Sequence, residues 1–156
     1  IKRAVEIIPL TTPKEEIAWS LRENILVALM QYTTYELLDE VVPISKFAEM
    51  IAYTKELQEK HGLKIINFGH AGDGNIHTVL MKENLEEVTW QTKRKALLDD
   101  FYKKVAELKG LPSTEHDNGI IRPYLEKMRK PVELYVMRKI KNANDPDNRF
   151  NPGILL

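Results

Sequence analysis

A glycine-rich segment between two short apolar runs constrains the fold of this chain most strongly. It reads Gly-His-Ala-Gly-Asp-Gly-Asn-Ile-His at residues 69–77. Asp-Gly between apolar runs is the strongest short-range indication of a two-residue β-hairpin turn, whose central residues take positive φ. We therefore predict an antiparallel hairpin over about residues 64–81, with Asp73 and Gly74 as the turn.

This turn would place the two histidines of the segment face to face. With Asp73 and Gly74 at the turn, Gly72 pairs with Asn75 and His70 with His77. Directly opposed residues have Cβ atoms about 4.5–5.5 Å apart, and an imidazole nitrogen binds zinc at about 2.0–2.1 Å. We predict that the histidine pair supplies two ligands of one metal ion. The same face would carry Ile66, Phe68, Val79 and Met81.

Two other interpretations of the segment stay open. It can be a glycine-rich turn with two incidental histidines, although half of the four histidines in the chain lie across this one turn. A phosphate-binding loop is the weaker alternative, because the glycines lack P-loop spacing and no Lys-Ser or Lys-Thr follows them.

Composition limits the possible partners. The 156 residues are 43% hydrophobic and 29% charged, which is typical of one globular unit or a piece of a larger protein. The 23 basic and 23 acidic residues balance, so no global positive field attracts nucleic acid. Without cysteine, metal ligands must come from His, Asp and Glu. Such a composition fits a reducing compartment, and we predict a cytoplasmic location.

The ends of the chain and its apolar runs indicate neither an anchor nor a leader. The run at residues 25–30 is too short to span a bilayer, and the start resembles no signal peptide. Since an initiator Met is also lacking, we expect a processed chain or a fragment.

Strands and helices alternate along the sequence. We predict helices over about residues 13–30, 45–60 and 85–109, a strand over 37–42, and the hairpin. Thr12 to Glu15 resembles a capping box with Pro13 at the first helical position, and Ser45 can cap the second helix. Gly62 and Gly110 follow helices as terminators. The apolar positions are Ile17, Leu21, Ile25 and Ala28 in the first helix and Phe47, Met50, Ile51 and Leu57 in the second.

A second polar segment, Ser-Thr-Glu-His at residues 113–116, offers a carboxylate beside an imidazole. Neighbouring side chains on an extended segment point in different directions. Glu115 can therefore be a third metal ligand while His116 faces a substrate. A surface turn with both side chains in solvent is the alternative.

Three segments together resemble the C-terminal substrate domain of FAD-linked 2-hydroxy acid dehydrogenases, a family that includes D-lactate dehydrogenases and the flavin subunit of glycolate oxidase. They are residues 69–77, residues 113–116, and Asp-Pro-Asp-Asn-Arg-Phe-Asn-Pro-Gly at 145–153, in the order of the family. Weaker agreement at residues 19–24 and 39–45 extends the resemblance over about residues 17–153.

The resemblance implies roles for particular residues. His70, His77 and Glu115 would hold a divalent transition metal such as zinc. His116 would be the general base, and Arg22 would bind the substrate carboxylate. A metal-chelated 2-hydroxy acid has a more acidic hydroxyl, so a base can take its proton while hydride leaves C2.

The hydride acceptor implied by the resemblance is FAD, which the family binds mainly on a separate domain absent from this chain. Asn151 would lie near the flavin edge or order the tail. The partners implied are a small 2-hydroxy acid, the flavin-binding domain or subunit, and an electron acceptor that the sequence does not identify.

Several positions depart from the pattern of the family. Thr114, Asp117 and Asn118 replace smaller or apolar residues beside the base. Ile154 stands where a lysine is common, and Val79 where some members have a polar substrate contact. The identity of the substrate is therefore open.

Together these observations predict an α+β domain: an antiparallel sheet with helices packed on one face and a His-His-Glu metal site at its edge. We expect residues 1–156 to be the metal and substrate part of an FAD-dependent D-2-hydroxy acid dehydrogenase or oxidase, inactive without its flavin domain. The alternatives are a non-catalytic metal-binding or interaction module derived from that family, and a zinc-dependent hydrolase.

Overall fold

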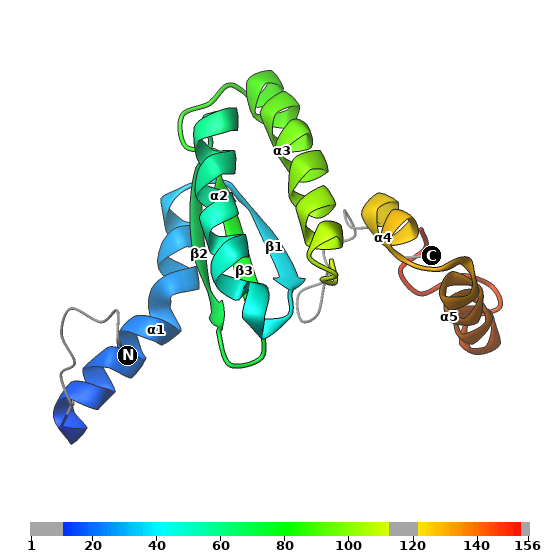
Figure 1. Ribbon diagram of the computed structural model, residues 1–156, viewed down its shortest axis with the longest axis horizontal. Coiled ribbons are helices and arrows are strands. Elements are labelled where there is room, and N and C mark those ends of the chain that lie inside the picture. The colour runs from blue at the N-terminus through cyan, green and yellow to red at the C-terminus, as the bar shows by residue number, and fades with distance from the viewer. Residues whose placement is uncertain (1–10, 113–121, 154–156) are drawn as a thin grey trace. The chain divides into compact units, whose positions relative to one another are not determined.

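The computed structural model describes residues 11–112 and 122–153, apart from the side chains of Thr12 and Arg122. The chain forms two compact units that divide between Thr34 and Tyr35. In its described part, the first unit consists of helix α1 (Thr12–Tyr32) and the residues next to it. The second unit combines an antiparallel sheet with helices (Figure 1), which confirms the predicted α+β class.

The described residues of the second unit form a three-stranded sheet in the order β1-β3-β2. Its strands are β1 (Tyr35–Val41), β2 (Lys64–His70) and β3 (Asn75–Met81), and both pairings are antiparallel. Every residue of the central strand β3 is buried, on both faces of the sheet. A polar group on β3 therefore needs a protein partner, because burial without one is costly.

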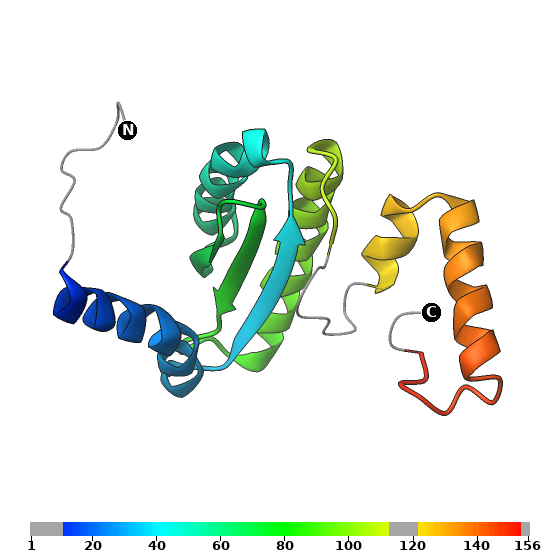
Figure 2. The same cartoon turned by 90° about the horizontal axis from the view of Figure 1, so that it is seen from below.

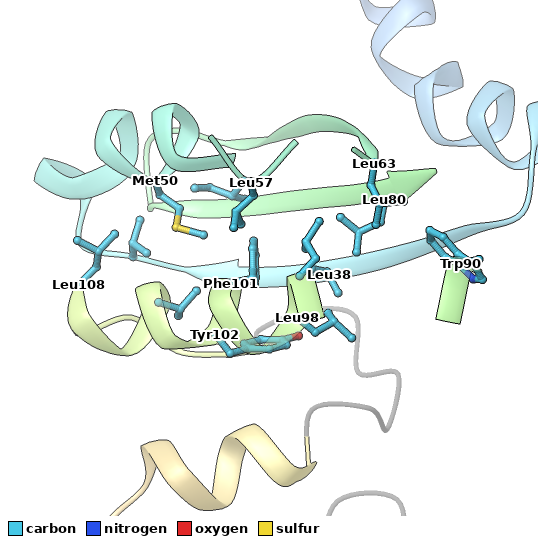
Figure 3. Packing of buried hydrophobic residues seen from close by; sticks show 14 residues of the cluster. Leu38, Met50, Leu57, Leu63, Leu80, Trp90, Leu98, Phe101, Tyr102 and Leu108 are labelled. Carbon is cyan, nitrogen blue, oxygen red and sulfur yellow. The ribbon is translucent and has the colours of Figure 1, made fainter. Parts of the chain in front are cut away.

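Two helices, α2 (Phe47–His61) and α3 (Glu87–Glu107), pack on one face of the sheet (Figures 1 and 2). Their apolar side chains meet alternate residues of the strands in the core (Figure 3). Buried completely or almost so are Leu38, Met50, Leu57, Leu80, Leu97 and Phe101. Each such side chain contributes roughly 1.5–3 kcal/mol relative to exposure, so this cluster holds the sheet in place.

The start of α2 differs from the prediction. A 3-10 turn, Ile44–Lys46, precedes the helix, and Lys46 rather than Ser45 is its N-cap residue. The cause is local: the backbone N–H of Lys46 donates to the carbonyl of Pro43 at 2.6 Å, which closes an i to i+3 turn. The predicted end is confirmed, since Gly62 is the C-cap with a left-handed φ of 60°.

Helix α1 begins one residue before the predicted Pro13, with Thr11 as its N-cap. Thr11 therefore stands where the predicted capping box has Thr12, and the side chain of Thr11 makes no capping hydrogen bond. The apolar stripe of this helix is exposed: Ile17 has 62% of its surface accessible and Leu21 has 68%. The helix prediction is correct, but none of the described side chains of the first unit is buried, so the stripe has no core to join among them.

The second unit ends with α4 (Arg122–Met128), α5 (Pro131–Asn144) and the segment up to residue 153. Tyr124 of α4 stacks on Tyr102 of α3 with ring centroids 4.3 Å apart, and its hydroxyl donates to Asp99 at 3.0 Å. Among the described residues, no helix combines the length and apolarity needed to cross a bilayer.

Candidate metal site

The hairpin between β2 and β3 has a longer turn than the sequence predicts. His70 pairs with Asn75, and Phe68 rather than His70 pairs with His77. The turn therefore has four residues, 71–74. The predicted two-residue turn needs positive φ at Asp73, but among the described residues only Gly74 takes it within this turn.

Local hydrogen bonds and one tertiary contact explain the longer turn. The carbonyl of His70 accepts hydrogen bonds from the N–H groups of both Asp73 and Gly74, each at 3.2 Å. The Asp73 carboxylate accepts from the N–H of Asn75 at 3.1 Å, a local bond that favours this conformation. The carbonyl of Gly74, which has a φ of 85°, accepts a hydrogen bond from the N–H of Val42 at 3.0 Å, so the turn is attached to the end of β1.

The two histidines nevertheless share a face of the sheet. A register shift of two residues preserves the alternation of side chains, so His70 and His77 become diagonal neighbours instead of opposed ones. Their ring centroids are 5.6 Å apart and their planes are nearly perpendicular, at 85°. Phe68 packs against His77 at 5.2 Å between centroids. The predicted common face is confirmed and the predicted pairing is wrong.

The sequence analysis missed a carboxylate on this face. Asp39 of β1 lies directly across from His77 in the β1-β3 pairing. Asp39 Oδ1 is 3.3 Å from His77 Nδ1, and it accepts a hydrogen bond from Asn75 Nδ2 at 2.8 Å. Its position between apolar residues of a predicted strand was the available indication, because a buried acid in such a strand needs a polar partner.

The two imidazoles of this face supply part of the ligand set that a divalent transition ion needs. Two imidazoles on one face, with a carboxylate beside one ring, resemble two ligands and an outer-shell partner. Within residues 11–112 and 122–153, no group of three or more His, Asp or Glu side chains is arranged to hold a metal. The third ligand predicted, Glu115, and the base predicted, His116, lie outside the described residues.

Two further predicted residues lie elsewhere in the structure. Arg22 is exposed on α1, with its guanidinium 5.4 Å from the ring centroid of Trp19. It belongs to the first unit. Asn151 is exposed in the closing segment, with a left-handed φ of 46°.

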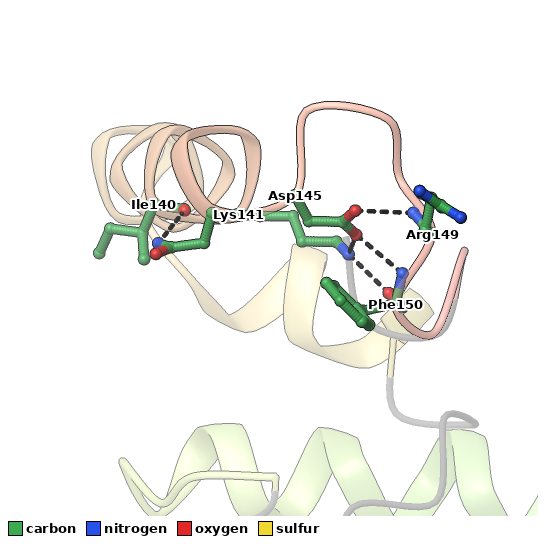
Figure 4. Close-up of polar contacts among 6 residues, drawn as sticks. Ile140, Lys141, Asp145, Arg149 and Phe150 are labelled. Atoms are coloured by element: carbon green, nitrogen blue, oxygen red, sulfur yellow. Dashed lines mark hydrogen bonds and ion pairs between the residues drawn. The ribbon is translucent and has the colours of Figure 1, made fainter.

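Asp145 orders the closing segment (Figure 4). Its carboxylate accepts from the backbone N–H groups of Arg149 at 2.7 Å and Phe150 at 2.9 Å, and from the ammonium of Lys141. The Lys141 hydrogen bond, with help from the two amides, lowers the pKa of Asp145. The order of this segment thus comes from Asp145, and the role of Asn151 stays a prediction.

A second acid of β1, Glu40, lies on the opposite face, towards the helices. It is fully buried, and this burial raises the pKa of its carboxyl group well above the usual range. Thr78 Oγ1 lies 2.8 Å from Glu40 Oε1 and 2.9 Å from Asn67 Oδ1.

Thr54 and Asn67 extend the hydrogen-bond network around Thr78 and Glu40. Thr54 donates to the carbonyl of Ile51 at 2.8 Å, so it accepts from Asn67 Nδ2 at 2.7 Å. This orients the Asn67 amide with its oxygen towards Thr78. Thr78 has one hydroxyl hydrogen, which it can donate to Glu40 or to Asn67 but not to both. When Thr78 donates to Asn67, Glu40 can bond Thr78 only as a protonated acid, the form that its burial favours.

Comparisons with known proteins agree with the resemblance seen in the sequence. Residues 4–155 match the model of the family described as FAD linked oxidases, C-terminal domain. The chain is 35% identical over 155 residues to D-lactate dehydrogenase of Anaerostipes hadrus, an alignment that covers 96% of this chain and 32% of that protein.

Other relatives show the same relation. Glycolate oxidase subunit GlcD of Bacillus subtilis (strain 168) is 34% identical over 153 residues, with 92% of this chain and 31% of that protein covered. D-2-hydroxyglutarate dehydrogenase of Xanthomonas citri pv. viticola is 35% identical over 144 residues, covering 88% and 30%. This chain therefore spans about a third of the length of these relatives.

Proposed function

Because the chain belongs to the FAD-linked oxidases and matches their C-terminal domain, we propose that it is the metal- and substrate-binding part of an FAD-dependent D-2-hydroxy acid dehydrogenase or oxidase. The names of the three relatives denote lactate, glycolate and 2-hydroxyglutarate, which are all 2-hydroxy acids. The observation that carries the proposal is the pair His70 and His77, whose rings lie 5.6 Å apart on one face.

In this proposal His70, His77 and Glu115 hold a divalent transition ion such as zinc. A bound ion of this kind supplies Lewis acidity to the hydroxyl and carboxylate oxygens of the substrate. Neutral imidazoles and a carboxylate are ligands that suit such an ion. The two histidines come from neighbouring strands of a well-packed sheet, so their positions do not depend on a flexible loop.

The remaining predicted residues have roles in proton transfer and binding. His116 takes the proton of the substrate hydroxyl as hydride leaves C2, and Arg22 binds the substrate carboxylate. FAD, held mainly by a domain outside this chain, supplies the hydride acceptor, and Asn151 lies near its edge or orders the tail. The cytoplasmic location predicted from composition belongs to the same proposal.

Val79 bears on substrate choice. It is fully buried on β3, where it pairs with Leu37 and Ile66, so this position offers no polar group to a substrate. Any polar contact that distinguishes one 2-hydroxy acid from another must come from a different residue.

The complete protein, with its flavin-binding domain, allows the roles of Glu115 and His116 to be tested. Glu115→Gln should lower metal content and flavin reduction together, because a neutral amide is a poorer ligand than a carboxylate. His116→Ala should keep the metal and slow flavin reduction by about 10²–10⁴-fold, the usual effect of losing a general base. Normal metal content and normal rates in both variants would contradict the proposal.

The same experiment separates the alternatives. A non-catalytic binding module would hold metal without reducing flavin in the presence of any D-2-hydroxy acid. A zinc-dependent hydrolase would turn over its substrate without flavin.

A further inference from the structure

Asp39 and His77 form a contact that the proposed ligand set does not use. They are directly paired residues of β1 and β3, and Asp39 Oδ1 approaches His77 Nδ1 to 3.3 Å. Both side chains are almost completely shielded: that of His77 is 5% exposed and that of Asp39 is 0% exposed. Solvent therefore screens the charge of Asp39 from the His77 ring only weakly.

A neutral imidazole has one N–H and one nitrogen lone pair, and only the lone pair can bind a metal. The contact between Asp39 and Nδ1 is electrostatic and does not have the geometry of a hydrogen bond. A carboxylate at this distance favours the tautomer that carries hydrogen on Nδ1, because its negative charge attracts an N–H and repels a nitrogen lone pair. The lone pair is consequently on Nε2, the ring atom on the far side from Asp39.

We propose that Asp39 is a positioning residue for the metal site: it holds His77 with hydrogen on Nδ1 and so makes Nε2 the metal-binding atom. This inference rests on the proposed function, since it assigns a role in the same site. It adds an outer-shell residue from a third strand to the predicted ligands. Partners of this kind fix the tautomer and orientation of a ligating histidine.

Asn75 holds Asp39 in place for this role. Its Nδ2 donates to the same oxygen, Oδ1, that faces His77, at 2.8 Å. The backbone N–H of Asn75 is in turn bonded to the Asp73 carboxylate at 3.1 Å. A series of contacts thus runs from the four-residue turn through Asn75 and Asp39 to His77. Asn75 is also the strand partner of His70.

The neighbouring acid of β1 provides a matched control. Glu40 follows Asp39 in the chain, but its side chain lies on the opposite face, bonded to Thr78. Glu40→Gln removes an acid at the adjacent position without touching His77, so it separates the specific role of Asp39 from a general effect on β1.

Nitrogen-15 NMR of histidine side chains in the metal-free chain tests the inference directly. The two ring nitrogens of a neutral imidazole have well-separated shifts, so the spectrum reports which nitrogen carries hydrogen. We expect His77 to carry it on Nδ1 in the wild type and in Glu40→Gln, and to lose that preference in Asp39→Ala. The inference is overturned if wild-type His77 carries its hydrogen on Nε2, or if Asp39→Ala leaves the tautomer unchanged.

Zinc titration of the same proteins gives a second readout. Asp39→Ala should weaken zinc binding by about 10–100-fold, the usual effect of removing an outer-shell partner. Glu40→Gln should leave it within about twofold. Asp39→Asn keeps the shape of the side chain and a partly negative oxygen beside Nδ1, so it should fold, and its zinc affinity should lie between those of wild type and Asp39→Ala.

The two readouts distinguish failure of this inference from failure of the proposed function. If the wild type binds no zinc but its His77 tautomer depends on Asp39, the positioning role stands and the metal proposal fails. If zinc binds tightly and neither the tautomer nor the affinity responds to Asp39, the metal proposal stands and the positioning role is wrong.

Discussion

Replacing Glu40 by Gln should make the protein more stable near neutral pH and should change how its stability depends on pH. Burial raises the pKa of the Glu40 carboxyl group well above the usual range, which favours its protonated form. Gln is similar in shape and can donate to Thr78 through its amide, but it has no proton to lose.

The sign and size of the effect follow from proton linkage. In the unfolded chain Glu40 ionises near pH 4.3, whereas in the folded protein it keeps its proton to higher pH. Between these two pKa values the folded state binds one proton more, so wild-type stability falls by about 1.4 kcal/mol per pH unit. The contribution of Glu40 is fully present below the unfolded pKa and is lost as the pH rises through the folded pKa.

Urea unfolding followed by circular dichroism at pH 4, 5 and 6 measures this difference. At pH 4 the free energy of unfolding of Glu40→Gln should be within about 1 kcal/mol of that of wild type, since one neutral donor replaces another. As the pH rises, the free energy of unfolding of Glu40→Gln should exceed that of wild type by an amount that grows towards about 1.4 kcal/mol per pH unit. Glu59→Gln, an exposed change on α2, measures the effect of removing one charge. Parallel curves for wild type and Glu40→Gln would refute the protonated state of Glu40.

Three further outcomes are expected. Gly74→Ala should lower the free energy of unfolding by about 1–2 kcal/mol for the left-handed backbone alone, and by more because the new Cβ would lie 2.0 Å from the Val42 carbonyl oxygen. Unchanged urea unfolding would refute the role given to Gly74 in the turn. Asp145→Ala should speed amide hydrogen exchange at Arg149 and Phe150. In wild type the protection of these two amides, measured relative to their intrinsic exchange rates, should fall as the pH drops through the lowered pKa of Asp145. Unchanged protection would contradict the role of Asp145. The purified chain alone should be colourless, and stoichiometric flavin in it would show that the predicted domain boundary is wrong.

The face on which the histidines lie was predictable, whereas their pairing was not. Side chains alternate along a strand, so a shift of two residues leaves His70 and His77 on the same face. The length of the turn depends on the bond between Gly74 and Val42, and that contact joins segments 32 positions apart. Local turn preferences contain no information about such a contact.

Local sequence patterns also could not predict which residues the two acids of β1 contact. Asp39 and Glu40 are adjacent in the sequence, but one meets His77 and the other Thr78, on opposite faces of the sheet. Both contacts depend on β1 pairing with β3 rather than with β2. The sequence predicted each strand, but the strand order came only from the structure.

Metal content of the purified 156-residue chain is the most direct test of the central claim. We expect about one divalent transition ion per chain, and a loss of most of it in both His70→Ala and His77→Ala, because two protein ligands hold such an ion less well than three. His61→Ala is the matched control, since His61 lies on α2 and binds Asp100 at 2.7 Å. A wild-type chain without metal, or equal metal content in all these variants, would contradict the account.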